Sequence, residues 1–251
     1  MAHSPYTAAS AVTSPGVASQ PATRGPRPGE AAAGAAAPRP ASPRRAWARA
    51  GVLAGLAGLA GFFASGALTD VPESALADNA DYVPLIAGEG ASVWLFQVLM
   101  SVAALGLAVF GAGLRRRLDE QEPVGSLAPT LAFVGLLLAA GLCLVGGGIS
   151  TELFWQLENA DKTDPDTVLA NVAILNTMGW VWAGVGLSAG AVAWAGITHE
   201  SVGRRLAWFS AVMATLIGVV QLVPLQYLAA LPGAVWCLVA GIAMARTART
   251  G

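Results

Sequence analysis

Apolar residues in this chain gather into long runs that short polar segments separate. A helix needs about 20 consecutive apolar residues to cross the hydrocarbon core of a bilayer. Four runs meet that length as single helices, at about 50–68, 93–114, 127–149 and 168–197. The pattern predicts an all-α, polytopic membrane helix bundle.

A fifth apolar run, 206–245, is twice as long as one crossing requires. It contains Pro224 and the pair Pro232-Gly233. Proline deletes a backbone donor and clashes with the preceding turn, so it breaks or kinks a helix. The run therefore predicts two helices joined by a tight turn, at 206–223 and 232–245, which makes six in all.

The charges test this division. Thirteen of the 14 Lys and Arg residues lie in the four segments that six helices place on one side: 1–49, 115–126, 198–205 and 246–251. The long segments on the other side, 69–92 and 150–167, hold ten of the 15 acids and only one basic residue, Lys162. Basic loops resist translocation, so we expect both termini in the cytoplasm of a bacterial plasma membrane. Five helices would put Arg246 and Arg249 outside.

Residues 1–46 form a low-complexity segment in which eight of the chain's 15 prolines alternate with Ala, Ser and Gly. Such a composition cannot bury a core. We therefore expect a disordered cytoplasmic tail before the transmembrane domain at 47–246, and a short tail at 247–251. Basic residues beside a membrane attract anionic lipid by about 1 kcal/mol each. Four arginines could make that contact or could act as a topology signal alone: Arg39, Arg44, Arg45 and Arg49.

Local signals mark some helix ends. The segment Asp164-Pro165-Asp166-Thr167 has an N-cap residue, a proline at the first helical position and an acid in the first turn, which predicts a helix start. Three consecutive arginines, Arg115 to Arg117, predict a helix end, where cations complement the helix dipole.

The first helix carries small residues at a spacing of four: Gly51 and Gly55, Ala54 and Gly58, Ala57 and Gly61. Such faces let helix backbones approach closely in a membrane. They could pair with a membrane protein partner or a second copy of the chain, or they could pack within one chain. The abundance of Ala and Gly throughout the sequence favours packing within the chain.

Four side-chain amides fall inside the predicted helices, in the half away from the basic segments: Gln97, Asn171, Asn176 and Gln221. Amides within a membrane need partners and so turn inward. Two hypotheses follow. The four amides line a polar cavity open to the outside that binds a small neutral solute, or they form hydrogen bonds that fix helix packing.

Composition excludes several classes of function. Charged residues make up 12% of the chain, against about 25% in a soluble domain, so much of the surface must face lipid. The net charge of −1 indicates no nucleic-acid partner. Cys143 and Cys237 lie in apolar runs, which predicts buried thiols, and the acid-rich segment 158–166 lacks the EF-hand spacing. The sequence shows no catalytic, metal or cofactor motif, so we expect neither an enzyme nor a cofactor.

The layout resembles the small six-helix membrane proteins of unknown function from high-GC bacteria. The resemblance rests on an Arg-Ala-rich entry at 44–51, a Gly-rich first helix, a long acidic outer loop, an Arg-terminated second helix and a Trp-rich fourth helix at 178–182. It implies the membrane fold and no active site. We expect a non-enzymatic accessory or scaffold component of the membrane; the alternative is a channel or carrier for a small neutral solute.

Overall fold

The structure is a computed structural model, and it describes residues 46–66, 68, 71–72, 79–223 and 225–247. Every regular element among them is a helix. Six segments are long and apolar enough to cross a membrane: Ala46–Gly66, Asn79–Asp119, Ala128–Glu158, Pro165–Thr198, Arg204–Leu222 and Tyr227–Arg246. The predicted all-helical membrane bundle is confirmed. The expected disordered tail, with Arg39, Arg44 and Arg45, lies outside the described residues, apart from its last position.

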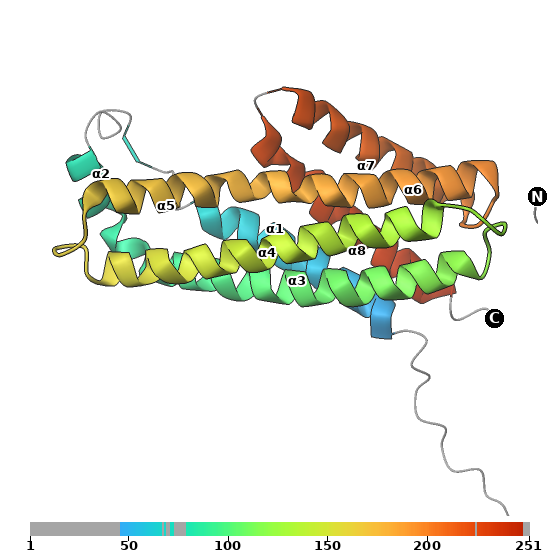
Figure 1. Cartoon of the computed structure of the whole chain (residues 1–251), viewed down its shortest axis with the longest axis horizontal. Helices are drawn as coiled ribbons and strands as arrows, with labels where there is room; N and C mark the ends of the chain where they lie inside the picture. The colour runs from blue at the N-terminus through green and yellow to red at the C-terminus, as the bar shows by residue number, and fades with distance from the viewer. Residues whose placement is uncertain (1–45, 67, 69–70, 73–78, 224, 248–251) are drawn as a thin grey trace, which may run out of the picture. The chain divides into compact units, whose positions relative to one another are not determined.

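The first three spans contain α1 (Ala46–Gly66), α2 (Asn79–Ile86), η3 (Ala87–Glu89), α3 (Gly90–Asp119) and α4 (Ala128–Glu158). The last three contain α5 (Pro165–Thr177), η4 (Met178–Trp182), α6 (Ala183–Thr198), α7 (Arg204–Leu222), η5 (Gln226–Ala229) and α8 (Ala230–Thr247). Successive spans run in opposite directions (Figure 1).

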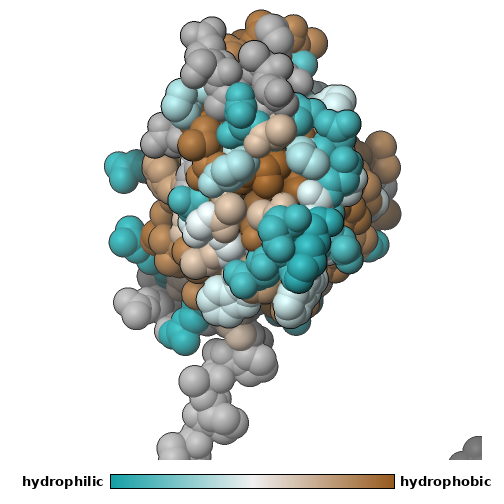
Figure 2. All heavy atoms as spheres, turned by 90° about the vertical axis from the view of Figure 1, so that its left-hand side faces the viewer, coloured by the Kyte–Doolittle hydropathy of each residue, from teal (hydrophilic) through white to brown (hydrophobic). Residues whose placement is uncertain are grey.

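The start of α1 and the end of α8 lie at the same end of the bundle as the loops 120–127 and 199–203 (Figure 1, right). We call this the basic end, because the described arginines lie here. The opposite end, formed by 79–92 and 150–167, is the acidic end. Figure 2 looks onto the acidic end, where hydrophilic residues gather on the end face and hydrophobic residues border it.

Helices extend beyond the apolar runs that predict them. α4 has 31 residues and continues to Glu158, nine residues past the predicted end at 149. At 1.5 Å per residue it is about 46 Å long, whereas the hydrocarbon core of a bilayer is about 30 Å thick. The last turns of α4, with the exposed Glu152, therefore stand beyond the hydrocarbon.

The last two spans divide earlier in the chain than expected. α7 ends at Leu222 and α8 begins at Ala230, so Pro232 lies inside the first turn of α8. Proline is tolerated there because the first amides of a helix have no partner within it. Val223 and Leu225 lie in turns before η5. The sixth span, Tyr227–Arg246, has 20 residues and is long enough to cross, whereas the predicted start at 232 leaves it short.

The predicted helix start at 164–167 is confirmed. Asp164 is the N-cap of α5, and its carboxylate accepts a hydrogen bond from the backbone N–H of Thr167 at 3.1 Å. Pro165 opens the helix and Asp166 lies in the first turn. Asp166 also accepts a hydrogen bond from Asn79 at 2.6 Å, which ties α2 to α5 at the acidic end.

We expect Asp164→Ala to lower the free energy of unfolding by about 1 kcal/mol, because the cap of α5 is lost. Thermal unfolding of the purified protein in detergent measures the effect. Asp161→Ala is the matched control, since Asp161 is an exposed acid of the same loop and caps no helix. Equal stability of the two variants would mean that the cap contributes nothing.

The small residues of α1 pack inside the chain. A Cβ on Gly51 would lie 2.7 Å from the ring of Phe110 in α3, and one on Gly55 would lie 2.6 Å from the backbone oxygen of Ala234 in α8. Added bulk at either position would therefore separate α1 from its neighbours. This face of α1 is covered by the protein's own helices and is not open to a partner.

α4 and α6 cross in backbone contact. A Cβ on Gly184 would lie 2.5 Å from the carbonyl oxygen of Gly135. The buried hydroxyl of Ser188, one turn further along α6, donates to the carbonyl oxygen of Ala132 at 2.8 Å. The close approach and this hydrogen bond fix the fourth span against the third.

Candidate functional site

The fourth span is irregular in its middle. Between α5 and α6 the chain forms the five-residue 3-10 helix η4, and η5 opens the last span in the same way. The two segments touch through their backbones, because a Cβ on Gly179 would lie 2.6 Å from the Cα of Tyr227. A 3-10 stretch inside a longer helix often marks a functional position. The sequence shows no sign of it, since residues 178–182 are as apolar as their neighbours.

A pocket of about 520 Å³ lies beside these two segments, in the half of the bundle nearer the acidic end. The end of α1, the first half of α3, α5, η4, η5 and α8 all contribute to its wall. Its lining is mainly apolar and aromatic, and includes Phe62, Phe63, Phe96, Met100, Met178 and Trp182.

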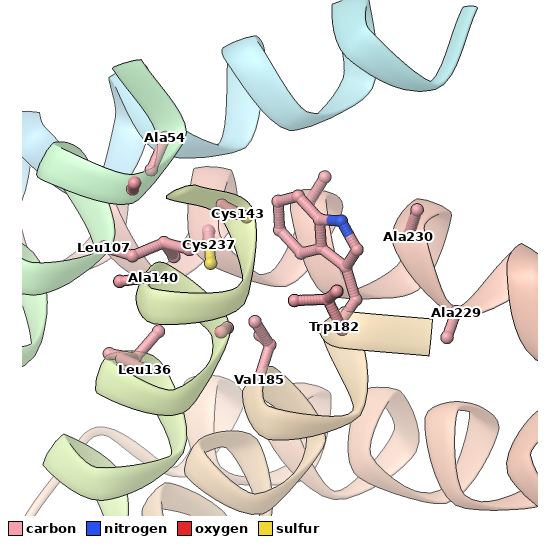
Figure 3. Close-up of a cluster of buried hydrophobic side chains, with 14 of the residues drawn as sticks. Ala54, Leu107, Leu136, Ala140, Cys143, Trp182, Val185, Ala229, Ala230 and Cys237 are labelled. Atoms are coloured by element: carbon pink, nitrogen blue, oxygen red, sulfur yellow. The ribbon is translucent and has the colours of Figure 1, made fainter. Parts of the chain in front are cut away.

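Trp182 forms a fixed part of the wall. Its side chain is 3% exposed and stands at the centre of a buried cluster between the helices (Figure 3). Glycines bring neighbouring helices against its ring. A Cβ on Gly58 of α1 would lie 2.5 Å from Cζ2, and a Cβ on Gly233 of α8 would lie 2.9 Å from Cε3. The ring therefore has little freedom to move, and this side of the pocket is preformed.

Among the described residues of the lining, three carry polar side chains: Ser65, Asn176 and Tyr227. The Ser65 hydroxyl is used locally, because it donates to the carbonyl oxygen of Phe62 at 2.9 Å. In the part of the chain that the structure describes, the side chain of Asn176 has no hydrogen-bond partner. An apolar pocket with a few polar groups is typical of sites that bind small molecules.

Of the four amides predicted to share a cavity, only Asn176 lines this pocket. Asn171 donates instead to the side-chain oxygen of Gln156 at 3.0 Å, which joins α5 to α4. Asn171 and Asn176 are five positions apart, and at about 100° per residue they point roughly 140° from one another. A single cavity could not take both from one face of α5.

The other two amides lie elsewhere. Gln97 is half-buried on α3 and does not line the pocket; its backbone carbonyl oxygen would lie 3.8 Å from a Cβ on Gly147 of α4. Both polar atoms of the Gln221 amide, near the end of α7, are buried without a hydrogen-bond partner among the described residues. The structure therefore does not bring the four amides into one cavity.

A second polar cluster lies at the basic end, and the sequence did not predict it. We call it the loop latch: Glu122 and Ser126 of one loop region, with His199 and Ser201 of the other. The Glu122 side chain is 1% exposed. It accepts hydrogen bonds from Ser126 at 2.6 Å and from Ser201, and one of its oxygens lies 2.9 Å from Nδ1 of His199.

The loop latch changes the acidity of Glu122. Burial alone would raise the pKa of this carboxyl group. Hydrogen bonds from Ser126, Ser201 and His199, together with the attraction of a charged imidazole, outweigh burial and hold the pKa below its usual value. Glu122 is thus an ionised group that joins two loops.

Of the arginines predicted to contact anionic lipid, the structure describes Arg49, which is exposed in the first turn of α1. In the described ranges, no group of three or more His, Cys, Asp or Glu side chains is placed to hold a metal ion. Comparison with family models, curated proteins and solved structures finds no match to this chain.

Proposed function

We propose that this multi-pass membrane protein binds a small, mainly apolar and electrically neutral molecule in the pocket beside η4 and η5, as a carrier or binding protein for such solutes. The pocket itself carries the proposal. Its volume of about 520 Å³ lies within the range of about 300–1,000 Å³ that is usual for small-molecule sites.

The lining limits the chemistry of the ligand. None of the described residues that line the pocket is Asp, Glu, Lys, Arg or His, so a charged ligand would lose its hydration there without compensation. Phe62, Phe96 and Trp182 offer apolar contact, and Asn176 offers one amide that can both donate and accept. A neutral molecule with one or two polar groups fits this set.

The break in the fourth span favours a solute-handling role. Transporters commonly build their sites from discontinuous helices, whose irregular backbone is tolerated only where protein or a cavity surrounds it. Here η4 and η5 come from different spans, contact one another and both line the pocket. The wall of the pocket is therefore built from irregular backbone of two different spans.

The expected accessory or scaffold role stays a prediction. One of the sequence features that fit it, the small-residue face of α1, is occupied by α3 and α8. The resemblance to six-helix proteins of high-GC bacteria also stays a prediction and supports neither role in particular.

The distribution of charge supports an orientation in a bacterial plasma membrane. We place the basic end, where Arg115 to Arg117 and Arg204 to Arg205 lie, in the cytoplasm, in keeping with the positive-inside rule. The pocket then belongs to the outer half of the membrane. A membrane-impermeant thiol reagent should label Asp161→Cys in intact cells and should leave Glu120→Cys unlabelled until the cells are lysed.

Binding is tested with uncharged aromatic and aliphatic alcohols as probes, by thermal shift and by native tryptophan fluorescence of the full chain. We expect Asn176→Leu to weaken binding of the best probe by about three- to tenfold, the value of one hydrogen bond. Gln97→Leu is the control, because it makes the same change outside the pocket. Ser65→Phe should block binding by filling the pocket.

The proposal fails if no neutral probe saturates a site on the wild-type protein. It also fails if a probe binds but Asn176→Leu and Ser65→Phe bind it as well as Gln97→Leu does, since the probe would then occupy another place. Each variant is first shown to unfold at a temperature close to that of the wild type.

A further inference from the structure

A second pocket, of about 510 Å³, lies at the basic end between the last turn of α3, the loop 199–203, the start of α7 and the end of α8. Three arginines from two helices line it: Arg117 of α3, and Arg204 and Arg205 of α7. We propose that this pocket binds the phosphate of an anionic phospholipid headgroup.

Among the described residues, no ion pair neutralises the arginines of the pocket. Within the described residues, the ion pairs are Arg115 with Asp119 and His199 with Glu122, and neither includes a pocket arginine. Among the described lining residues, Glu200 is the one acid beside the three arginines, which gives these residues a net charge of about +2 at neutral pH. A phosphate group is a natural counterion for such a set.

The start of α7 adds to this field. Arg204 and Arg205 occupy the first turn of a 19-residue helix, where the helix dipole is positive, and the N-cap Gly203 supplies no side-chain acceptor. Two cations at the positive end of a helix oppose the dipole and cost stability. A bound anion would remove that repulsion, because helix N-termini and arginines both favour phosphate.

The loop latch fixes one wall of the pocket. Ser201, which lines the pocket, donates to Glu122 from the neighbouring loop. Gln121 faces Arg117 with its amide oxygen 3.0 Å from Nη2 in the orientation that satisfies both ends of the amide. This neutral partner orients the guanidinium and leaves its charge available.

The level of the pocket in the membrane favours a lipid headgroup over a free anion as its ligand. Arg204 begins the fifth span and Arg117 lies two residues before the end of α3, which is the level of lipid phosphates. The remaining lining is largely apolar, with Val202, Leu206, Ala243 and Met244. The partly buried Leu206 suits the glycerol and the first methylene groups of a lipid, which inorganic phosphate lacks. Basic pockets between membrane helices are known to hold anionic headgroups.

The test uses the delipidated full chain in neutral detergent, titrated with phosphatidylglycerol, phosphatidylcholine or inorganic phosphate and followed by thermal shift and native mass spectrometry. We expect saturable binding of phosphatidylglycerol alone. The double variant Arg204→Gln/Arg205→Gln should bind it about 30-fold more weakly, at roughly fivefold per arginine near an anionic headgroup.

The matched control is Arg115→Gln/Arg116→Gln, which removes the same charge from the same end of the bundle but from outside the pocket. It should change the affinity by less than about threefold. Without lipid, the Arg204→Gln/Arg205→Gln variant should be at least as stable as the wild type, since the repulsion at the α7 terminus is relieved.

Three results would overturn the proposal. The first is equal loss of binding in the two double variants, which would make the effect one of net charge. The second is the absence of a saturable phosphatidylglycerol site, which would leave the arginines as a topology signal. The third is an equally large shift with inorganic phosphate, which would make the site one for free anions.

Discussion

Replacement of Gly184 by leucine is expected to abolish the folded bundle. A Cβ at this position would lie 2.5 Å from the carbonyl oxygen of Gly135 and 3.2 Å from the backbone nitrogen of Ala139. Overpacking commonly costs about 1–3 kcal/mol where side chains can move aside. Here the obstacle is the backbone of α4, so we expect a larger loss, comparable to much of the total stability of about 5–15 kcal/mol.

The measurement is the yield of monodisperse protein in detergent, followed by thermal unfolding of whatever folds. Gly141→Leu is the control: it makes the same change on α4, at an exposed glycine where an added Cβ meets no atom within 4 Å. This variant should fold as the wild type does. If Gly184→Leu were equally stable, α4 and α6 could not cross as closely as they do here.

The spans can be predicted from the sequence because one local property, the hydropathy of each run, determines them. Lipid offers no partner for a polar backbone, so every crossing is a helix of apolar residues, and such runs are visible one at a time. Hydropathy alone, however, predicts the ends of the helices incorrectly. α4 continues to Glu158 after its apolar run stops, because a helix does not have to end where the hydrocarbon ends.

The break in the fourth span could not be predicted in this way. The residues of η4, 178–182, are apolar and contain no proline. What changes the helix there is the approach of Gly179 to the backbone of Tyr227, a contact between residues nearly 50 positions apart. Such contacts depend on how the helices are arranged, which the hydropathy of one segment does not report.

The candidate site, too, is predicted from the sequence only in part. The sequence identifies Asn176 as a polar residue of the membrane region, and the structure places it in the pocket. The hypothesis of one shared cavity also includes Asn171, but five positions along a helix turn its side chain about 140° away from that of Asn176. Gln156, the partner of Asn171, lies beyond the end of the helix predicted at 127–149, so the apolar pattern does not indicate this hydrogen bond.

The loop latch was missed for a different reason. Glu122 and His199 are far apart in the chain, and each looks like an ordinary loop residue by itself. The one available signal was that the two loops, 120–127 and 199–203, are short and predicted to lie on the same side of the membrane. Two short loops on the same side can meet, and a carboxylate beside a histidine and serines is then a natural link.

The loop latch supports the second large expected effect. Glu122→Ala should lower the free energy of unfolding by about 2–3 kcal/mol at neutral pH, because a buried, ionised acceptor is lost and its donors Ser126, Ser201 and His199 are left without it. Glu120→Ala is the control, since Glu120 is an exposed acid of the same loop region. Its stability should be within about 0.5 kcal/mol of the wild type.

The pH dependence separates this ionic link from simple loss of packing. Because the pKa of Glu122 is lower in the folded protein than in the unfolded chain, its contribution is fully present above the usual glutamate pKa of about 4.3 and is lost as the pH falls through the folded value. The wild type should therefore lose part of its stability below about pH 4.3.

Glu122→Gln, which keeps the shape of the side chain but does not ionise, should lack this component of the acid-induced loss. The difference in stability between the wild type and Glu122→Gln should therefore be largest near neutral pH and shrink as the pH falls. No difference, or a difference that stays constant across that range, would show that ionisation of the carboxylate does not contribute to stability. The two loops would then be held by packing, and the wall of the basic-end pocket would not depend on charge at Glu122.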